Sequence, residues 1–98
     1  MTTNQIALDL KNNFIICWYQ YGSEYGPRAL GHRSILANPS IRDNLIVINK
    51  YIKHREIWRP LAPIILDDHF NDIFHEDSQL SEYMLRTYII DAKYRKMF

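Results

Sequence analysis

The sequence predicts a small α/β domain, built as a partial twisted sheet with short helices. Compact runs rich in β-branched and aromatic residues are typical of strands, and they occur at 14–20, 34–37, 61–66 and 85–90. Segments with helical apolar spacing alternate with these runs, which favours the α/β class. The chain has 98 residues, of which 47% are hydrophobic and 23% charged. This composition is typical of one folded domain and excludes a disordered chain.

The first expected elements are a helix over residues 3–12, capped by Thr3, and a buried strand over 14–20. Cys17 lies in this strand between apolar neighbours, so we expect a buried thiol rather than a nucleophile. A lone cysteine forms no internal disulfide, and this favours a reducing, cytoplasmic location. The start of the chain lacks a signal-peptide pattern, and no apolar run approaches the roughly 20 residues that span a bilayer, so no membrane partner is expected.

A loop over residues 21–32 follows, with three glycines and a proline that predict sharp turns. The short strand 34–37 then leads through a turn at 38–40 into a helix over 41–52. The helical spacing of four apolar residues predicts the buried stripe of this helix, formed by Ile41, Leu45, Ile48 and Ile52.

The second half is predicted to contain a charged loop at 53–60, a strand at 61–66, and a helix from Asp67 to about residue 74. A polar loop at 75–83 and a strand at 85–90 complete the pattern. So few strands leave a sheet edge without a partner. We therefore expect residues 1–98 to form a single partial domain that belongs to a larger unit.

The charge is concentrated in the middle of the chain. The net charge is +1, but residues 26–59 contain seven Lys or Arg and only two Asp or Glu. A basic block inside a near-neutral chain predicts a localised anion site rather than a uniformly cationic surface.

The most specific stretch is EYGPRALGHRSIL, at residues 24–36. Arg28 and Arg33 lie five residues apart across a turn of small residues, and Ser34 adds a hydroxyl group. Arginine donates bidentate hydrogen bonds that suit phosphate and carboxylate oxygens. The competing interpretation is that Arg28 pairs with Glu24 or another carboxylate and that the glycines only form a turn.

The second basic cluster is KHREIWRPLAP, at residues 53–63, in which Lys53, Arg55 and Arg59 supply three cations. Taken alone, this cluster is equally consistent with a solvated charged loop, in which Trp58 belongs to the core. Taken together, the two arginine-bearing turns predict a pocket for a phosphate-containing small molecule. Neither a Walker loop nor a dinucleotide-binding fingerprint is present.

The strings EYGPRALGHRSILANP and IKHREIWRPLAPIIL resemble the C-terminal region of NodU/CmcH-type O-carbamoyltransferases. The resemblance implies a YrdC-like α/β domain, of which this chain is the front portion, and places the metal-binding N-terminal domain outside it. It also implies that carbamoyl phosphate and ATP are bound here and form carbamoyl adenylate. The carbamoyl group would then pass to a hydroxyl acceptor in the N-terminal domain.

By the same resemblance, Arg28, Arg33, Lys53, Arg55 and Arg59 belong to the anion pocket. Mg²⁺ is implied together with ATP, although no residues of this chain form a recognisable site for it, and the four histidines do not form a metal set.

The chain departs from the usual family pattern at His32, Asn38 and Ser40, where asparagine, aspartate and arginine are usual. The departure at Ser40 removes one cation.

Two other functions stay open at this point. A YrdC-like module that binds nucleic acid is disfavoured by the low net charge and by the compact basic turns. A non-catalytic remnant that needs a partner chain is the other alternative.

Overall fold

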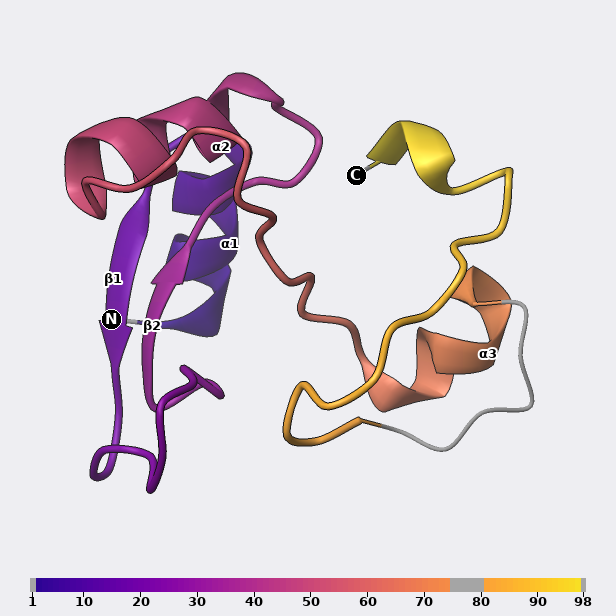
Figure 1. Ribbon diagram of the computed structural model, residues 1–98, viewed down its shortest axis with the longest axis horizontal. Coiled ribbons are helices and arrows are strands. Elements are labelled where there is room, and N and C mark those ends of the chain that lie inside the picture. Colours follow the sequence, from indigo (N-terminus) through magenta and orange to yellow (C-terminus); the bar gives the residue numbers. More distant parts are fainter. Residues whose placement is uncertain (1, 75–80, 98) are drawn as a thin grey trace.

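The computed structural model describes residues 2–74 and 81–97, which form two groups of elements joined by the extended segment 60–66 (Figure 1). The first group contains α1 (Thr3–Lys11), β1 (Ile16–Tyr19), β2 (Arg33–Leu36), α2 (Asp43–Ile46) and the π-helix η1 (Val47–Ile52). The second group contains the 3-10 helix η2 (Asp67–His69), α3 (Phe70–Ile73) and the 3-10 helix η3 (Arg95–Met97). Helices combined with a small sheet confirm the predicted α/β class.

Helix α1 forms close to its predicted range, but its cap differs. The hydroxyl oxygen of Thr2, not Thr3, accepts a hydrogen bond from the backbone N–H of Gln5 at 3.3 Å. The residue that precedes the first helical turn must be extended for this contact, and Thr2 has φ −86° and ψ 156°. The helix buries no residue, so packing contributes little to its stability.

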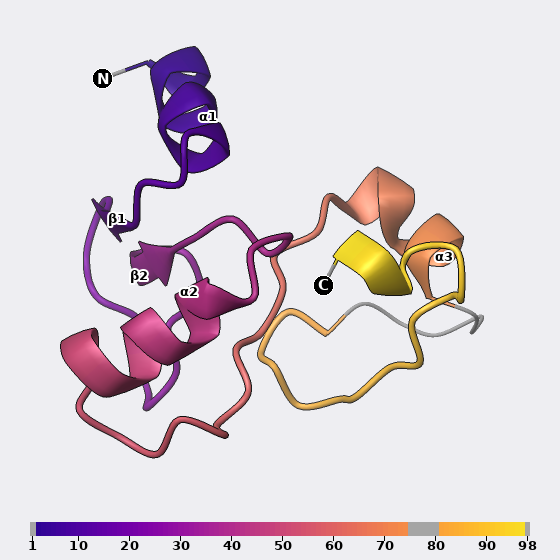
Figure 2. The same ribbon diagram turned by 90° about the horizontal axis from the view of Figure 1, so that it is seen from above.

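Strands β1 and β2 pair antiparallel in a two-stranded sheet, with Ile16 opposite Leu36 and Tyr19 opposite Arg33. Figure 2 shows this sheet lying between α1 and the continuous α2–η1 helix. Because side chains alternate along a strand, Cys17 lies on the exposed face of β1 while its neighbours are half-buried. The prediction of a buried thiol was therefore wrong: the apolar run is a four-residue strand that is covered on one face only.

The helix predicted over 41–52 is present as α2 followed directly by η1, in which backbone N–H groups bond five residues back. The N–H of Lys53, for example, donates to the carbonyl oxygen of Ile48 at 2.8 Å. Of the predicted apolar stripe only Ile48 is fully buried, and the other two buried positions are Asn44 and Asn49. The π-helical segment thus turns a polar residue into the core beside Ile48.

Two predicted strands do not form. Residues 61–66 are extended but belong to no strand, and Ile64 and Leu66 are largely exposed. Residues 85–90 contribute only an isolated bridge, between Ile90 and Phe74. An apolar run becomes a strand only where a neighbour pairs with its backbone over several residues. The described residues supply no such partner to 61–66 and a single bridge to 85–90. Part of the predicted loop 75–83, namely 75–80, lies outside the described residues.

The helix predicted from Asp67 is divided into η2 and α3, and Leu66 rather than Asp67 occupies the cap position, without a side-chain hydrogen bond. Phe70 and Phe74, at the two ends of α3, form an aromatic cluster with Tyr88 from a later segment, and the ring centres lie 4.9–5.1 Å apart. Among the described residues, the buried apolar side chains are Ile48, Phe70 and Phe74. Each group of elements therefore has a very small core of its own.

Within residues 2–74 and 81–97, no helix has the length and apolar character needed to cross a membrane.

Candidate functional site

The carboxylate of Glu24 organises the glycine-containing loop between β1 and β2. One of its oxygens, Oε1, accepts hydrogen bonds from the backbone N–H groups of Leu30 at 2.8 Å, His32 at 2.8 Å and Arg33 at 3.0 Å. Gly31, with φ +96°, takes the left-handed backbone that lets the chain curl around this single oxygen. The loop thus wraps a carboxylate that lies earlier in the same motif.

These contacts favour the charged form of Glu24. The N–H of Leu30 first, and then that of Arg33, lower the pKa of the Glu24 carboxyl group from 4.5 to about 2. The carboxylate is thus fully charged at neutral pH and acts as a fixed acceptor. The ion pair with Arg28 that the sequence left open is not formed among the described residues. Glu24 instead anchors the loop. The available signal in the sequence was its position just before the glycine-proline turn.

The predicted binding residues of this first cluster have three different surroundings. Arg28 is exposed and makes no hydrogen bond or ion pair within the described part of the chain. The guanidinium carbon of Arg33 lies 5.2 Å from the ring centre of Tyr19 on the paired strand, a cation–π contact. The hydroxyl oxygen of Ser34 accepts a hydrogen bond from the N–H of Gly31 at 3.1 Å, so Ser34 supports the loop from inside.

The side chain of Asn49 organises the second basic cluster. Asn49 is 0% exposed, and its amide nitrogen donates to the backbone carbonyls of Arg59 at 2.8 Å and Ile57 at 3.3 Å. Its amide oxygen accepts a hydrogen bond from Nε of Arg55 at 2.7 Å. The loop 53–59 is therefore folded back over η1 and held by one buried amide, which the sequence analysis missed. The available signal was a polar residue next to the predicted apolar stripe.

The remaining members of the second cluster are exposed. Lys53 ends η1, and its ammonium group has no partner among the described residues. Nε of Arg59 lies 3.4 Å from a carboxylate oxygen of Glu56, with both side chains about half-exposed at 53%. Trp58 is 73% exposed, which corrects the prediction that it lies in the core. Asn49 binds the loop backbone on both sides of Trp58, and this turns the indole outward.

The two clusters do not meet in the described structure. The loop that carries Arg28 lies at one end of the β1–β2 pair, and the loop 53–59 lies beyond the other end, beside α2 and η1 (Figure 1). No hydrogen bond or ion pair within residues 2–74 and 81–97 joins them. Arg28, Arg33 and Ser34 are thus brought together around one loop, and Lys53, Arg55 and Arg59 around another. The single pocket predicted from all six residues stays a prediction.

The acidic side chains of the second group, Asp67, Asp68 and Asp72, are exposed to solvent. The ring nitrogen Nδ1 of His69 lies 3.8 Å from a carboxylate oxygen of Asp72, with both side chains exposed. Among the described residues, no group of three or more His, Cys, Asp or Glu side chains is placed to hold a metal ion. His75 lies outside the described residues.

Comparison with known proteins agrees with the two motifs. Residues 7–98 match the family model described as "Carbamoyltransferase C-terminus". The chain is 39% identical to nodulation protein NolNO of Sinorhizobium fredii over 84% of its own length and 12% of that protein. It is 42% identical to the 3'-hydroxymethylcephem-O-carbamoyltransferase of Amycolatopsis lactamdurans over 84% of its length and 15% of that enzyme.

A third relative, nodulation protein NolO of Bradyrhizobium diazoefficiens, is 46% identical over 66% of this chain and 12% of that protein. The chain thus spans only 12–15% of the length of these curated relatives. The family match covers nearly all of the present sequence and includes both anchored basic loops. The chain therefore belongs to the carbamoyltransferase C-terminus family.

Proposed function

We propose that this chain supplies part of the site at which an O-carbamoyltransferase binds carbamoyl phosphate and ATP and forms carbamoyl adenylate. The carbamoyl group then passes to a hydroxyl acceptor held elsewhere in the enzyme. Membership of the family supports carbamoyl transfer in general. The relative from Amycolatopsis lactamdurans carries an O-carbamoyltransferase name, which supports a hydroxyl group as acceptor.

The observation that carries this proposal is that each basic loop is anchored by one polar side chain, charged in the first loop and buried in the second. The guanidinium and ammonium groups of the loops are left to bind an anion. Glu24 fixes the backbone around Arg28 and Arg33. Asn49 occupies only the Nε–H of Arg55, and no other described residue bonds to this guanidinium group, so its terminal nitrogens can donate to two oxygens of an anion. Preorganised cations of this kind neutralise phosphoryl oxygens without reorganising during the reaction.

Phosphate-bearing ligands fit these residues by charge and by donor geometry. Arg28, Arg33, Lys53, Arg55 and Arg59 would bind phosphoryl and carbamoyl oxygens, and the half-buried hydroxyl group of Ser34 would border them. Because the two loops lie at different ends of the sheet, we assign them to separate ligands or to separate parts of one ligand. Mg²⁺, which commonly accompanies ATP, would be held by the phosphates rather than by a dedicated carboxylate cluster of the described residues.

Isothermal titration of carbamoyl phosphate into the chain, with and without ATP and Mg²⁺, tests the proposal. We expect saturable binding that weakens at least about tenfold in Arg28→Ala or Arg55→Ala, the effect of losing one charge-assisted hydrogen bond. Lys11→Ala on α1 is the matched control, because it removes one exposed cation that belongs to neither loop. Circular dichroism melts establish that each variant is folded.

Two results would overturn the assignment. The first is a folded chain that does not bind carbamoyl phosphate under any of these conditions. The second is undiminished binding in both arginine variants. RNA binding with a steep salt dependence, and no binding of carbamoyl phosphate, would instead favour a nucleic-acid module.

A further inference from the structure

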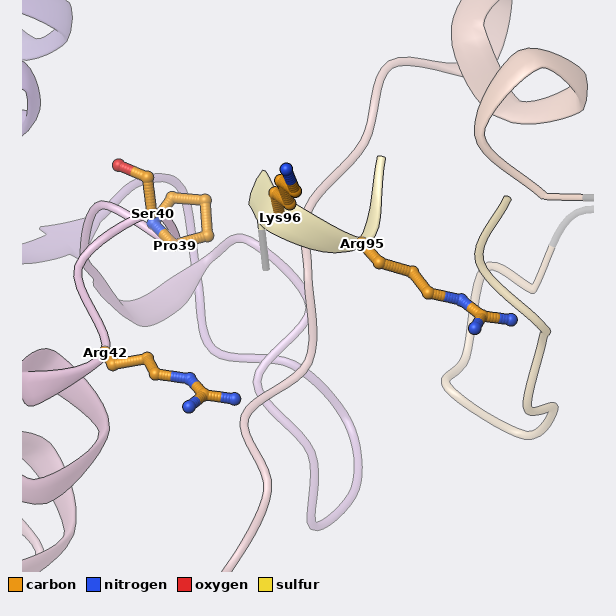
Figure 3. A pocket seen from close by; sticks show the side chains of 5 residues that line it. All are labelled: Pro39, Ser40, Arg42, Arg95 and Lys96. Atoms are coloured by element: carbon orange, nitrogen blue, oxygen red, sulfur yellow. The ribbon is translucent and has the colours of Figure 1, made fainter. Parts of the chain in front are cut away.

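A hollow outside the two anchored loops collects three cationic side chains from distant parts of the sequence. Its volume is about 320 Å³, and it is lined by Pro39, Ser40, Arg42, Arg95 and Lys96 (Figure 3). The first three residues precede α2, and the last two belong to η3. The hollow therefore lies where the two groups of elements meet.

Among the described residues, the side chains that line this hollow include no carboxylate to balance its charge. The guanidinium group of Arg42 and the ammonium group of Lys96 make no hydrogen bond or ion pair within the described residues. Nε of Arg95 donates to the carbonyl oxygen of Ile90 at 3.3 Å, and Figure 3 shows its guanidinium group turned away from Arg42. Like charges that gather without a counter-charge raise the local potential and favour an anion in the hollow. Arg42 and Lys96 are the direct donors, and Arg95 adds charge from further away.

The wall that carries Arg42 is internally braced. The side-chain oxygen of Asn38 accepts hydrogen bonds from the N–H of Ser40 at 3.0 Å and from its hydroxyl group at 2.7 Å. The buried amide of Asn44 donates to the backbone carbonyl of Asn38 at 3.1 Å. A fixed turn reduces the entropy that is lost when a ligand orders the site. The hollow is thus bounded on this side by a preorganised turn rather than by a loose loop.

We propose that this hollow is a second anion site, which binds a small ligand bearing phosphate groups. Its volume falls at the lower end of the range for small-molecule sites. Three cations around one concavity suit a compact polyanion better than a nucleic acid, which needs a row of phosphate contacts. The site shares no residue with the two loops in the proposed carbamoyl phosphate site, so it stands whether or not that function is correct.

Titration of inorganic pyrophosphate into the full chain tests this site, followed by calorimetry and by backbone amide NMR shifts. We expect saturable binding with the largest shifts at residues 39–42 and 95–96. Arg42→Gln and Lys96→Gln should each weaken binding at least about tenfold, as expected for one lost charge-assisted hydrogen bond. Lys11→Gln on α1 is the matched control, because Lys11 is an exposed cation outside the hollow and outside both anchored loops, and it should leave pyrophosphate binding unchanged. Arg28→Gln reports pyrophosphate that binds at the first loop instead of the hollow.

Arg42 and Lys96 are both exposed, and their charged groups have no hydrogen-bond or ion-pair partner in the described part of the chain. We therefore expect both variants to fold normally, which a thermal melt verifies. Loss of binding in Arg28→Gln, with retention in Arg42→Gln and Lys96→Gln, would place the anion at the first loop and overturn the proposal. Absence of binding to the folded chain would overturn it as well. The same substitutions could also weaken the binding of RNA more than they weaken the binding of pyrophosphate. That result would identify the ligand of the hollow as a nucleic acid rather than a small molecule.

Discussion

Replacing Asn49 by alanine should loosen the second basic loop far more than its size suggests. The substitution removes the hydrogen bond to Arg55 at 2.7 Å and those to the carbonyls of Arg59 and Ile57 at 2.8 and 3.3 Å. A hydrogen bond to a charged group contributes about 1.5–3 kcal/mol, and a neutral one about 1 kcal/mol. The long bond to Ile57 lies at the weak end of that range. The expected loss in free energy of unfolding is therefore about 3 kcal/mol.

The assay is urea denaturation, with the free energy of unfolding obtained by linear extrapolation. The Nε–H resonance of Arg55 in ¹⁵N-correlated NMR spectra reports the local effect, because Asn49 is its hydrogen-bond acceptor. In Asn49→Ala this resonance should move to the position of a solvated guanidinium. Asn49→Asp keeps an acceptor for Arg55 but loses the donor to the two carbonyls, so it should retain the Arg55 signal and still destabilise the loop.

Asn44→Ala is the matched control, since Asn44 is a second buried amide on the same helix. Its amide nitrogen donates to Asn13 and to the carbonyl of Asn38, not to the basic loop. We expect it to lower the free energy of unfolding by about 1–2 kcal/mol, the sum for two neutral hydrogen bonds, without moving the Arg55 resonance. The reasoning is refuted if Asn49→Ala changes stability by less than about 0.5 kcal/mol, or if Asn44→Ala shifts the Arg55 resonance equally.

Three further predictions concern single contacts. The pKa of Glu24 is lowered from 4.5 to about 2, so its charged form stabilises the folded chain fully above pH 4.5, and this stabilisation is lost as the pH falls toward 2. An NMR titration of the Glu24 carboxyl group measures this pKa, and a midpoint near 4.5 would contradict the prediction. Glu56→Gln should change the free energy of unfolding by less than about 0.5 kcal/mol in urea titrations, since its ion pair with Arg59 is half-exposed, and a loss above about 1 kcal/mol would show that the pair is more than a surface contact. Cys17 should react with a thiol reagent in the native chain as fast as it does in urea, whereas a strong lag in the native state would mean that the thiol is protected.

The sequence predicted the loops and the first sheet more accurately than it predicted the second half. Residues 14–20 and 34–37 contain β1 and most of β2, because both the apolar runs and the glycine-containing loop between them are local signals. Residues 61–66 and 85–90 have the same apolar character, but a strand is decided by the segment that pairs with it. Pairing depends on residues far away in sequence, so a local pattern does not specify it.

The same distinction applies to the candidate site. The cationic residues, such as Arg28 and Arg55, can be identified from the sequence by residue type alone, and the structure places them on two exposed loops. The anchors, Glu24 and Asn49, act through the backbone of residues six to ten positions away. A carboxylate or an amide has many local uses, so its sequence position does not say which N–H or carbonyl it meets. The separation of the two basic loops likewise follows from the antiparallel strands and from the return of the chain over η1.

These anchors explain why the family motifs are concentrated in loops. With Ile48, Phe70 and Phe74 as the buried apolar side chains of the described chain, hydrophobic burial provides little that would distinguish one loop conformation from another. A carboxylate that binds three N–H groups, or a buried amide that binds two carbonyls, penalises every conformation that leaves these groups unpaired. Substituting an anchor should therefore change where the cations lie, even when all the arginines and lysines are kept. For this chain, the positions that fix the loop backbones are as important to anion binding as the positions that carry the charge.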